Sequence, residues 1–244
     1  MATAGLSDAT LAALTEVDTP TVCNVIELFG VRPRNTGFLD DRIRACFPQL
    51  PPLVGYALTS CFRSGAPPRG ADVYAGMGRQ IEMYAELPGP PVIVFQDLDE
   101  PTVAATFGEV MCTTYQAFGA RGLITSGTGR DLDQVEALRF PAFTSGTTCA
   151  HGYCHILAVG APVSVGGITI YQGDLLHGDR NGVTTIPTDL AADVPGACKE
   201  LMAAEEIVLE YVRGKNITVK GMEEARAECG RAIDKLGQRL RGKQ

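Results

Sequence analysis

The chain has 244 residues, enough for one large domain or two small ones with a substantial apolar core. Hydrophobic residues make up 45% and charged residues 20%, which is typical of a globular protein and excludes an intrinsically disordered chain. The net charge of −7 argues against nonspecific nucleic-acid binding, because that requires a basic surface. We therefore expect no nucleic-acid partner, although a small anionic substrate is compatible with this charge, because one local arginine can bind it.

The first residues lack the basic segment and long apolar core of a signal peptide, and no apolar run approaches the length of a membrane span. The eight cysteines include no CxxC pair, so we expect most of them to be reduced and buried. These features predict a cytoplasmic protein without a membrane partner.

The N-terminal part predicts two short helices, over residues 7–17 and 19–30, followed by an irregular linker. In the second helix, Thr19 is the expected N-cap, Pro20 the first helical residue and Gly30 the terminator.

The central part alternates strand-like and helix-like segments. Strands are predicted at residues 53–62, 90–98, 122–126 and 140–145. Helices are predicted at residues 71–87, 107–122 and 130–140. This alternation predicts parallel strands joined by helical crossovers.

Residues 161–187 predict several short strands with turns at Gly166-Gly167, Gly173-Asp174 and residues 180–182, and helical spacing resumes at residue 188. We expect a single α/β domain. Its expected parts are an N-terminal helical arm (1–50), an α/β core (51–187) and C-terminal helices (188–244).

Adjacent Arg130 and Asp131 follow a small-residue run at the start of a predicted helix. A guanidinium binds a carboxylate in two-point fashion, and an aspartate offers hard oxygens suited to Mg²⁺ or Mn²⁺. The alternative interpretation is structural: Asp131 caps its helix and Arg130 forms a surface ion pair. The local sequence alone favours the structural interpretation.

A second candidate is the predicted helix that begins near Gly108. The backbone N–H groups of Glu109, Val110 and Met111 would point from its positive end towards an anion, and Gly108 would let a ligand approach the backbone. This helix start and the Arg-Asp pair both follow predicted strands, so both can lie at the carboxyl edge of one sheet. The structural alternative is that Glu109 only complements its helix dipole.

The cluster Cys149, His151, Cys154 and His155 raises the question of zinc. In an extended strand the side chain of Cys154 faces away from those of the two histidines, and no second ligand pair lies at finger-like spacing. Structural zinc is therefore disfavoured, and we expect His151 and His155 to face a pocket or a subunit contact.

Residues 108–143, GEVMCTTYQAFGARGLITSGTGRDLDQVEALRFPAF, resemble the core of the regulator-of-ribonuclease-activity-A-like (RraA-like) family. The shared signature is an acidic residue, twenty intervening residues and then Arg-Asp; here it is Glu109 followed by Arg130 and Asp131. Residues 161–187 are similar to the family's VGG…PGDL…GDxxGVxxxP segment. The family includes divalent-metal-dependent 4-hydroxy-4-methyl-2-oxoglutarate aldolases, which also decarboxylate oxaloacetate.

The resemblance implies a three-layer β/β/α fold of the swivelling-domain type. It also implies homotrimers or homohexamers with sites at the subunit interfaces. A glutamate from the C-terminal helix of the neighbouring subunit would complete each site. Glu206 is our placement for that glutamate, with Glu205 and Glu210 as rivals.

The resemblance also implies a role for each motif residue. Asp131 would ligate Mg²⁺ or Mn²⁺, and Arg130 would bind the pyruvyl part of a small 2-oxo acid. The N–H groups of Val110 and Met111, beside Gly108, would hold its carboxylate. Glu109 would position a water or proton carrier.

The expected function is a metal-dependent lyase that cleaves 4-hydroxy-2-oxo acids to pyruvate. A divalent cation can stabilise the enolate that this cleavage produces. A Schiff-base mechanism is disfavoured because the chain has no lysine before Lys199. The competing hypothesis is a non-catalytic regulator that binds a ribonuclease or another protein, as the family's namesake does. The retained acidic residue and Arg-Asp pair favour the enzyme.

Overall fold

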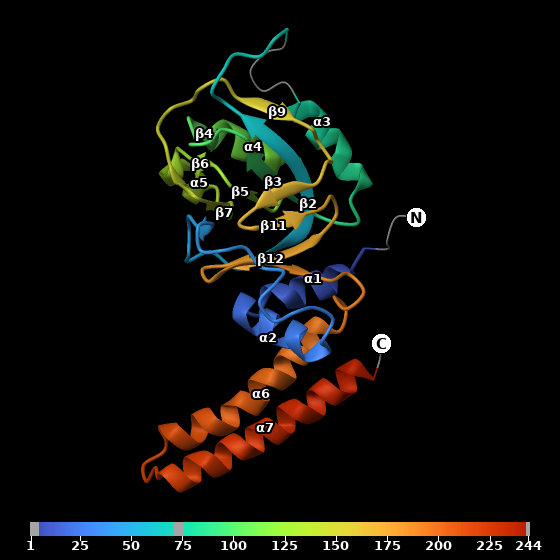
Figure 1. Cartoon of the computed structure of the whole chain (residues 1–244), viewed down its shortest axis with the longest axis vertical. Coiled ribbons are helices and arrows are strands. Elements are labelled where there is room, and N and C mark those ends of the chain that lie inside the picture. Colours follow the sequence, from blue (N-terminus) through green and yellow to red (C-terminus); the bar gives the residue numbers. More distant parts are fainter. Residues whose placement is uncertain (1–4, 71–75, 243–244) are drawn as a thin grey trace.

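The computed structural model describes residues 5–70 and 76–242. An α/β body lies at one end, and a long hairpin of two C-terminal helices, α6 (Val194–Arg213) and α7 (Val219–Arg241), extends away from it (Figure 1). The N-terminal helices α1 (Asp8–Thr15) and α2 (Thr19–Phe29) lie where the hairpin joins the body (Figure 1). No helix within the described residues is long and apolar enough to cross a membrane.

The body is built on an eight-stranded mixed sheet of order β1-β7-β5-β3-β2-β12-β13, with β9 also paired to β2. The strands are β1 (Arg44–Ala45), β2 (Leu53–Arg63), β3 (Pro91–Asp97), β5 (Gly122–Thr125), β7 (Ala142–Thr144), β9 (His155–Leu157), β12 (Leu175–Asp179) and β13 (Gly182–Ile186). Neighbours among β2, β3, β5 and β7 pair in parallel, as the alternating pattern predicts. The long β2 pairs with β12 at its start and with β9 at its end, and it curves strongly between them (Figure 1).

Two smaller sheets complete the body. A hairpin of β10 (Val163–Val165) and β11 (Ile168–Ile170) turns at Gly166-Gly167, as predicted. A three-stranded parallel sheet contains β4 (Ala105–Phe107), β6 (Thr128–Gly129) and β8 (Gly146–Thr147). This sheet is not foreseen from the sequence, because strands of two or three residues show no periodicity.

The crossover helices are short. They are α3 (Met77–Glu82) with a following 3₁₀ turn (Met83–Glu86), α4 (Glu109–Ala117) and α5 (Leu132–Ala137). Part of the helix predicted at 71–87 lies outside the described residues, which omit 71–75. The mixed α/β class predicted from the sequence is confirmed.

Two predicted helix boundaries are wrong. Asp18, not Thr19, caps α2, because its extended backbone lets its carboxylate accept the Thr21 N–H at 2.7 Å. The helical spacing predicted from residue 188 becomes α6 only at Val194. Pro195 has no N–H to donate, so it belongs in the first turn of that helix and cannot lie deeper inside.

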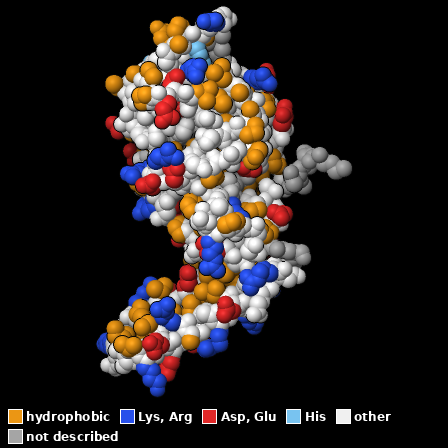
Figure 2. Space-filling model, in the orientation of Figure 1, with side chains coloured by type: hydrophobic (Ala, Val, Ile, Leu, Met, Phe, Trp, Pro, Cys, Tyr) orange, Lys and Arg blue, Asp and Glu red, His pale blue; other side chains and the backbone are white. Residues whose placement is uncertain are grey.

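The two halves of α6 differ in burial. Its first half packs on α1 and α2 through buried residues that include Ala197, Cys198 and Leu201. The far half of the hairpin leaves large apolar side chains exposed: Met202, Leu209, Val212, Ile217 and Val219. Hydrophobic side chains gather at the free end of the hairpin (Figure 2). The far half therefore has little core of its own.

The N-terminal helices are attached to the sheet through His177 of β12, whose side chain is fully buried. Its Nε2–H donates to the Leu14 carbonyl at 2.9 Å, and the Thr19 hydroxyl lies 2.9 Å from Nδ1. Because a carbonyl can only accept, Nδ1 of the neutral ring accepts from Thr19. Burial lowers the pKa of His177, with the Leu14 carbonyl opposing that effect.

This lowered pKa predicts a pH-dependent stability. As the pH falls through about 6.5, the unfolded chain binds a proton at residue 177 more readily than the folded chain does. The free energy of unfolding should then fall, by up to about 1.4 kcal/mol per pH unit for this one proton. Urea unfolding at pH 7.5, 6.5 and 5.5 measures the slope. His177→Gln should flatten the slope and His155→Gln should keep it; an unchanged slope in His177→Gln would contradict the assignment.

Candidate functional site

Arg130 and Asp131 lie directly after β6, at the carboxyl edge of the small parallel sheet. The Arg130 N–H donates to the Phe107 carbonyl at 3.1 Å, so the end of β6 is joined to the end of β4. The two motifs thus meet at one sheet edge, as expected, but this edge belongs to the small sheet and not to the large one.

Asp131 has a left-handed backbone, with φ 55° and ψ 40°. This conformation is uncommon outside glycine, and such strained residues cluster at functional sites. Asp131 is the residue before α5 but makes no side-chain cap hydrogen bond to it, so its capping role predicted as the structural alternative is wrong. Its carboxylate is directed elsewhere.

The Asp131 carboxylate faces the start of α4. Its Oδ2 accepts the Glu109 N–H at 3.1 Å and lies 3.6 Å from Nε of Arg130. A Cβ on Gly108 would lie 2.5 Å from this same oxygen and 3.1 Å from that nitrogen, so no other residue fits at 108 without displacing one of them. The Arg130 and Asp131 side chains are 29% and 37% exposed, which leaves both accessible to a ligand.

The N-terminus of α4 has no side-chain cap. The expectation that three of its N–H groups are open is wrong for Glu109, because that N–H already donates to Asp131. The backbone N–H groups of Val110 and Met111 donate to no backbone carbonyl among the described residues. Val110 is 68% exposed and Met111 is buried, while Glu109 is exposed.

A small depression lies at this point. It is lined by Ala105, Phe107, Gly108, Val110, Met111, Arg130, His151 and Cys154. Its volume of about 10 Å³ is close to that of a single water, so one chain alone forms only a shallow site. His151 is therefore the pocket-facing histidine of the two considered in the sequence, whereas His155 lies on β9.

Cys154 closes one side of the depression. Its thiol donates to the His151 carbonyl at 3.2 Å. Burial raises the pKa of Cys154, and the charge of Arg130 opposes that effect. The described residues contain no cluster of three or more histidine, cysteine, aspartate or glutamate side chains able to hold a metal, so the structure gives no support to structural zinc here.

The glutamate expected to complete the site is not nearby in the same chain. Glu206 lies on the projecting part of α6, where Arg213 contacts it at 2.6 Å (Figure 1). Its rivals Glu205 and Glu210 lie on the same helix. Any of the three would have to reach Asp131 from another copy of the chain.

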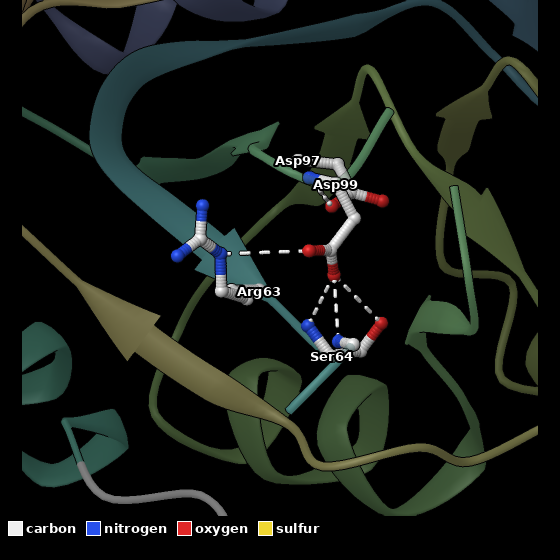
Figure 3. A network of polar contacts seen from close by, with 5 residues as sticks. Arg63, Ser64, Asp97 and Asp99 are labelled. Carbon is white, nitrogen blue, oxygen red and sulfur yellow. Dashed lines mark hydrogen bonds and ion pairs between the residues drawn. The ribbon is translucent and has the colours of Figure 1, made fainter. Parts of the chain in front are cut away.

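A larger polar cavity, of about 300 Å³, lies at the carboxyl ends of β3, β5 and β7. Two of its acidic residues, Asp97 and Asp99, lie beside Arg63 and Ser64 (Figure 3). Asp99 is already satisfied: it accepts from the Ser64 N–H at 2.6 Å and lies 3.4 Å from Nε of Arg63. Burial raises the pKa of Asp97, and the charge of Asp99 adds to this effect.

Arg42 is the cationic side chain among the residues that line the larger cavity. It is held by Asp40 at 2.6 Å. The smaller depression is lined by Arg130 and by the start of α4, and the Asp131 carboxylate lies beside both, so we assign the candidate site there.

Comparisons with known proteins identify the family of the chain. The family model described as RraA-like (Aldolase/RraA) matches residues 3–185. A protein of Halalkalibacterium halodurans with the provisional name 4-hydroxy-4-methyl-2-oxoglutarate aldolase is 33% identical over 125 residues, which are 51% of this chain and 59% of that protein. The matched part thus spans less than two thirds of that relative.

Solved structures show the same fold. A Pseudomonas syringae pv. tomato protein superposes with a TM-score of 0.70 at 24% identity, over 91% of this chain and 95% of that one. A Streptomyces coelicolor member of the RNase ES inhibitor RraA protein family superposes with a TM-score of 0.65 at 21% identity, over 83% and 96%. Because the family model matches well over half of its residues, the chain belongs to the RraA-like family.

Proposed function

We propose that the protein is a divalent-metal-dependent carbon–carbon lyase. It cleaves 4-hydroxy-2-oxo acids, such as 4-hydroxy-4-methyl-2-oxoglutarate, to pyruvate, and it decarboxylates oxaloacetate. The observation that carries the proposal is the meeting of Arg130, Asp131 and the uncapped α4 N-terminus around Gly108. The provisional name of the Halalkalibacterium halodurans relative supports the same reaction class.

The residues fit a Mg²⁺ or Mn²⁺ ion. Oδ2 of Asp131 is oriented by Glu109 and Arg130, while Oδ1 makes no hydrogen bond to another described residue. Mg²⁺ characteristically keeps several waters and takes only one or two protein carboxylates, so a site with a single carboxylate per chain is adequate. Glu206 of a neighbouring subunit would supply the second.

When bound, the cation supplies Lewis-acid stabilisation of the negative charge that develops on the oxo acid. Arg130 binds the carboxylate and 2-oxo end of the substrate, because its guanidinium is permanently charged and matches two oxygens at once. The N–H groups of Val110 and Met111 hold the carboxylate at the positive end of α4. Glu109 positions a water from the exposed side of the site.

Asp131→Ala should reduce oxaloacetate decarboxylation at least about 100-fold, because it removes the group that places the cation. Arg130→Ala should raise KM for the oxo acid more than it lowers kcat. Activity of the wild type should vanish with EDTA and return with Mg²⁺ or Mn²⁺. Circular dichroism and Tm check that both variants fold. Wild-type protein that is inactive with either metal would favour the non-catalytic regulator instead.

Gly108→Ala should lower kcat/KM about 100-fold, since its Cβ would displace the Asp131 carboxylate, and ångström-scale displacements have effects of this size. The matched control is Gly78→Ala in α3, where an added Cβ meets nothing within 4 Å. This control should keep full activity. Equal activity in the two variants would show that the close approach at Gly108 is irrelevant to turnover.

We further propose a homotrimer or homohexamer whose sites are completed across subunits. The projecting hairpin, with its exposed apolar side chains, has the length and character of an arm that packs on a neighbouring copy. In this arrangement Asp131 of one subunit and Glu206 of the next serve the same site.

Subunit mixing tests this arrangement. Asp131→Ala and Glu206→Gln should each be inactive alone, and light scattering should show that both form oligomers. Co-expressed in equal amounts, they should recover about one quarter of wild-type activity, because each site needs one protomer of each kind in the right order. An active Glu206→Gln protein would move the assignment to Glu205 or Glu210. No recovery on mixing would contradict the shared site.

A further inference from the structure

Three fully buried polar side chains connect α4 to α3 and to β2: Tyr115, Gln80 and Ser60. The Tyr115 hydroxyl donates to Oε1 of Gln80 at 2.6 Å, and Nε2 of Gln80 donates to the Ser60 hydroxyl oxygen at 2.8 Å. The Ser60 hydroxyl in turn donates to the Thr59 carbonyl at 2.7 Å. Each donor in this series meets an acceptor, and the proposed chemistry uses none of the three side chains.

The hydroxyl of Tyr115 adds a directional contact to an apolar cluster. A buried hydroxyl or amide is unfavourable unless it is hydrogen-bonded, so the series is stable only when it is complete. Burial raises the pKa of Tyr115, so its hydroxyl keeps its proton and remains a donor. A phenylalanine ring at position 115 would fill the same space, but it would not specify where α4 lies relative to Gln80.

Tyr115 is coupled to the candidate site through the geometry of α4. Residues four apart on a helix lie one above the other, so Tyr115 shares a face with Met111. Met111 is 3% exposed and lines the depression. A rotation of α4 about its own axis would therefore break the contact of Tyr115 and displace the N–H groups of Val110 and Met111 together.

Two other polar contacts hold α4 against its surroundings. At its start the Glu109 N–H donates to Asp131 at 3.1 Å, and near its end Nε2 of Gln116 donates to the Leu138 carbonyl at 3.0 Å. Both of these contacts are exposed to solvent, whereas that of Tyr115 is buried. A buried hydrogen bond is electrostatically stronger than one in water, so the contact of Tyr115 restrains the helix most strictly.

We propose that Gln80 and Tyr115 are positioning residues for the oxo-acid site, an inference that rests on the proposed lyase function. Neither side chain lines the depression. Gln80 fixes the rotation of α4 relative to β2, an inner strand of the large sheet. The helix then presents the N–H groups of Val110 and Met111 to the substrate carboxylate. A site at the edge of the small sheet is in this way held in register with the large one.

Tyr115→Phe should raise KM for oxaloacetate about tenfold and keep kcat within about threefold, because a displacement below about 1 Å weakens carboxylate binding without removing Arg130 or Asp131. Steady-state kinetics with saturating Mg²⁺, well below the Tm of the variant, measure both constants. A purely structural role predicts a lower Tm with an unchanged KM.

Tyr84 provides the matched control. Its ring packs against the same apolar cluster, and its hydroxyl oxygen is buried but has no hydrogen-bond partner among the described residues. Tyr84→Phe therefore deletes the same atom as Tyr115→Phe without breaking a contact of this kind. Its KM should equal that of the wild type. Equal KM values in the two variants would contradict the positioning role.

A double variant separates positioning from stability. Tyr115→Phe alone leaves Oε1 of Gln80 buried without its donor, so Tm should fall. Adding Gln80→Met removes both partners, a change that is nearly neutral for stability when the shape is kept. Ser60 retains its own acceptor, the Thr59 carbonyl. Tm should then recover while KM stays raised; a KM that recovers together with Tm would overturn the inference.

Amide resonances test the inference without turnover. In NMR spectra of the ligand-free protein, Tyr115→Phe should shift the Val110 and Met111 amide signals, and Tyr84→Phe should leave them in place. Unshifted Val110 and Met111 signals in Tyr115→Phe would refute the positioning role, even if the wild type is an active lyase. A wild type that is inactive with either metal, but whose amides shift as expected, would refute the lyase function and not the role of Gln80 in orienting α4.

Discussion

The candidate site depends on one close approach between backbone and side chain. The ends of β4 and β6 are joined by the hydrogen bond from Arg130 to Phe107, and this pairing brings Asp131 against the residue that follows β4. That residue is Gly108, and a Cβ there would lie 2.5 Å from Oδ2 of Asp131. The absence of a side chain at Gly108 thus leaves room for the Asp131 carboxylate at the start of α4.

The close approach at Gly108 also affects the hydrogen-bond donors at the start of α4. The first N–H groups of α4 differ in what they donate to. Glu109 donates to the protein's own carboxylate, and the next two N–H groups remain for a ligand. An N–H of Glu109 and the neighbouring guanidinium of Arg130 hold the Asp131 carboxylate in position.

The hydrogen bonds around Asp99 connect β2 to the segment beside the candidate site. Asp99 accepts the Ser64 N–H (Figure 3). The Ser64 carbonyl in turn accepts the Tyr153 N–H. The end of β2 is in this way connected to the segment that carries His151. A polar cavity of about 300 Å³ lies next to this network, and it is lined by the acidic residues Asp97, Asp99 and Glu100 and by Arg42. Cavity size therefore does not identify the site, whereas the chemistry of the lining residues does.

The sequence by itself determined the alternation of strands and helices, the glycine turns of the later strands and the meeting of the Glu109 and Arg-Asp motifs at a sheet edge. These features follow from local periodicity and from residue types with strong conformational preferences. Only the tertiary structure decided which sheet that edge belongs to, because β4, β6 and β8 are too short to show a period and form through long-range pairing. It also decided that Asp131 takes the Glu109 N–H and that His151, not His155, lines the site. Those outcomes depend on contacts between residues far apart in the chain, which no local pattern specifies.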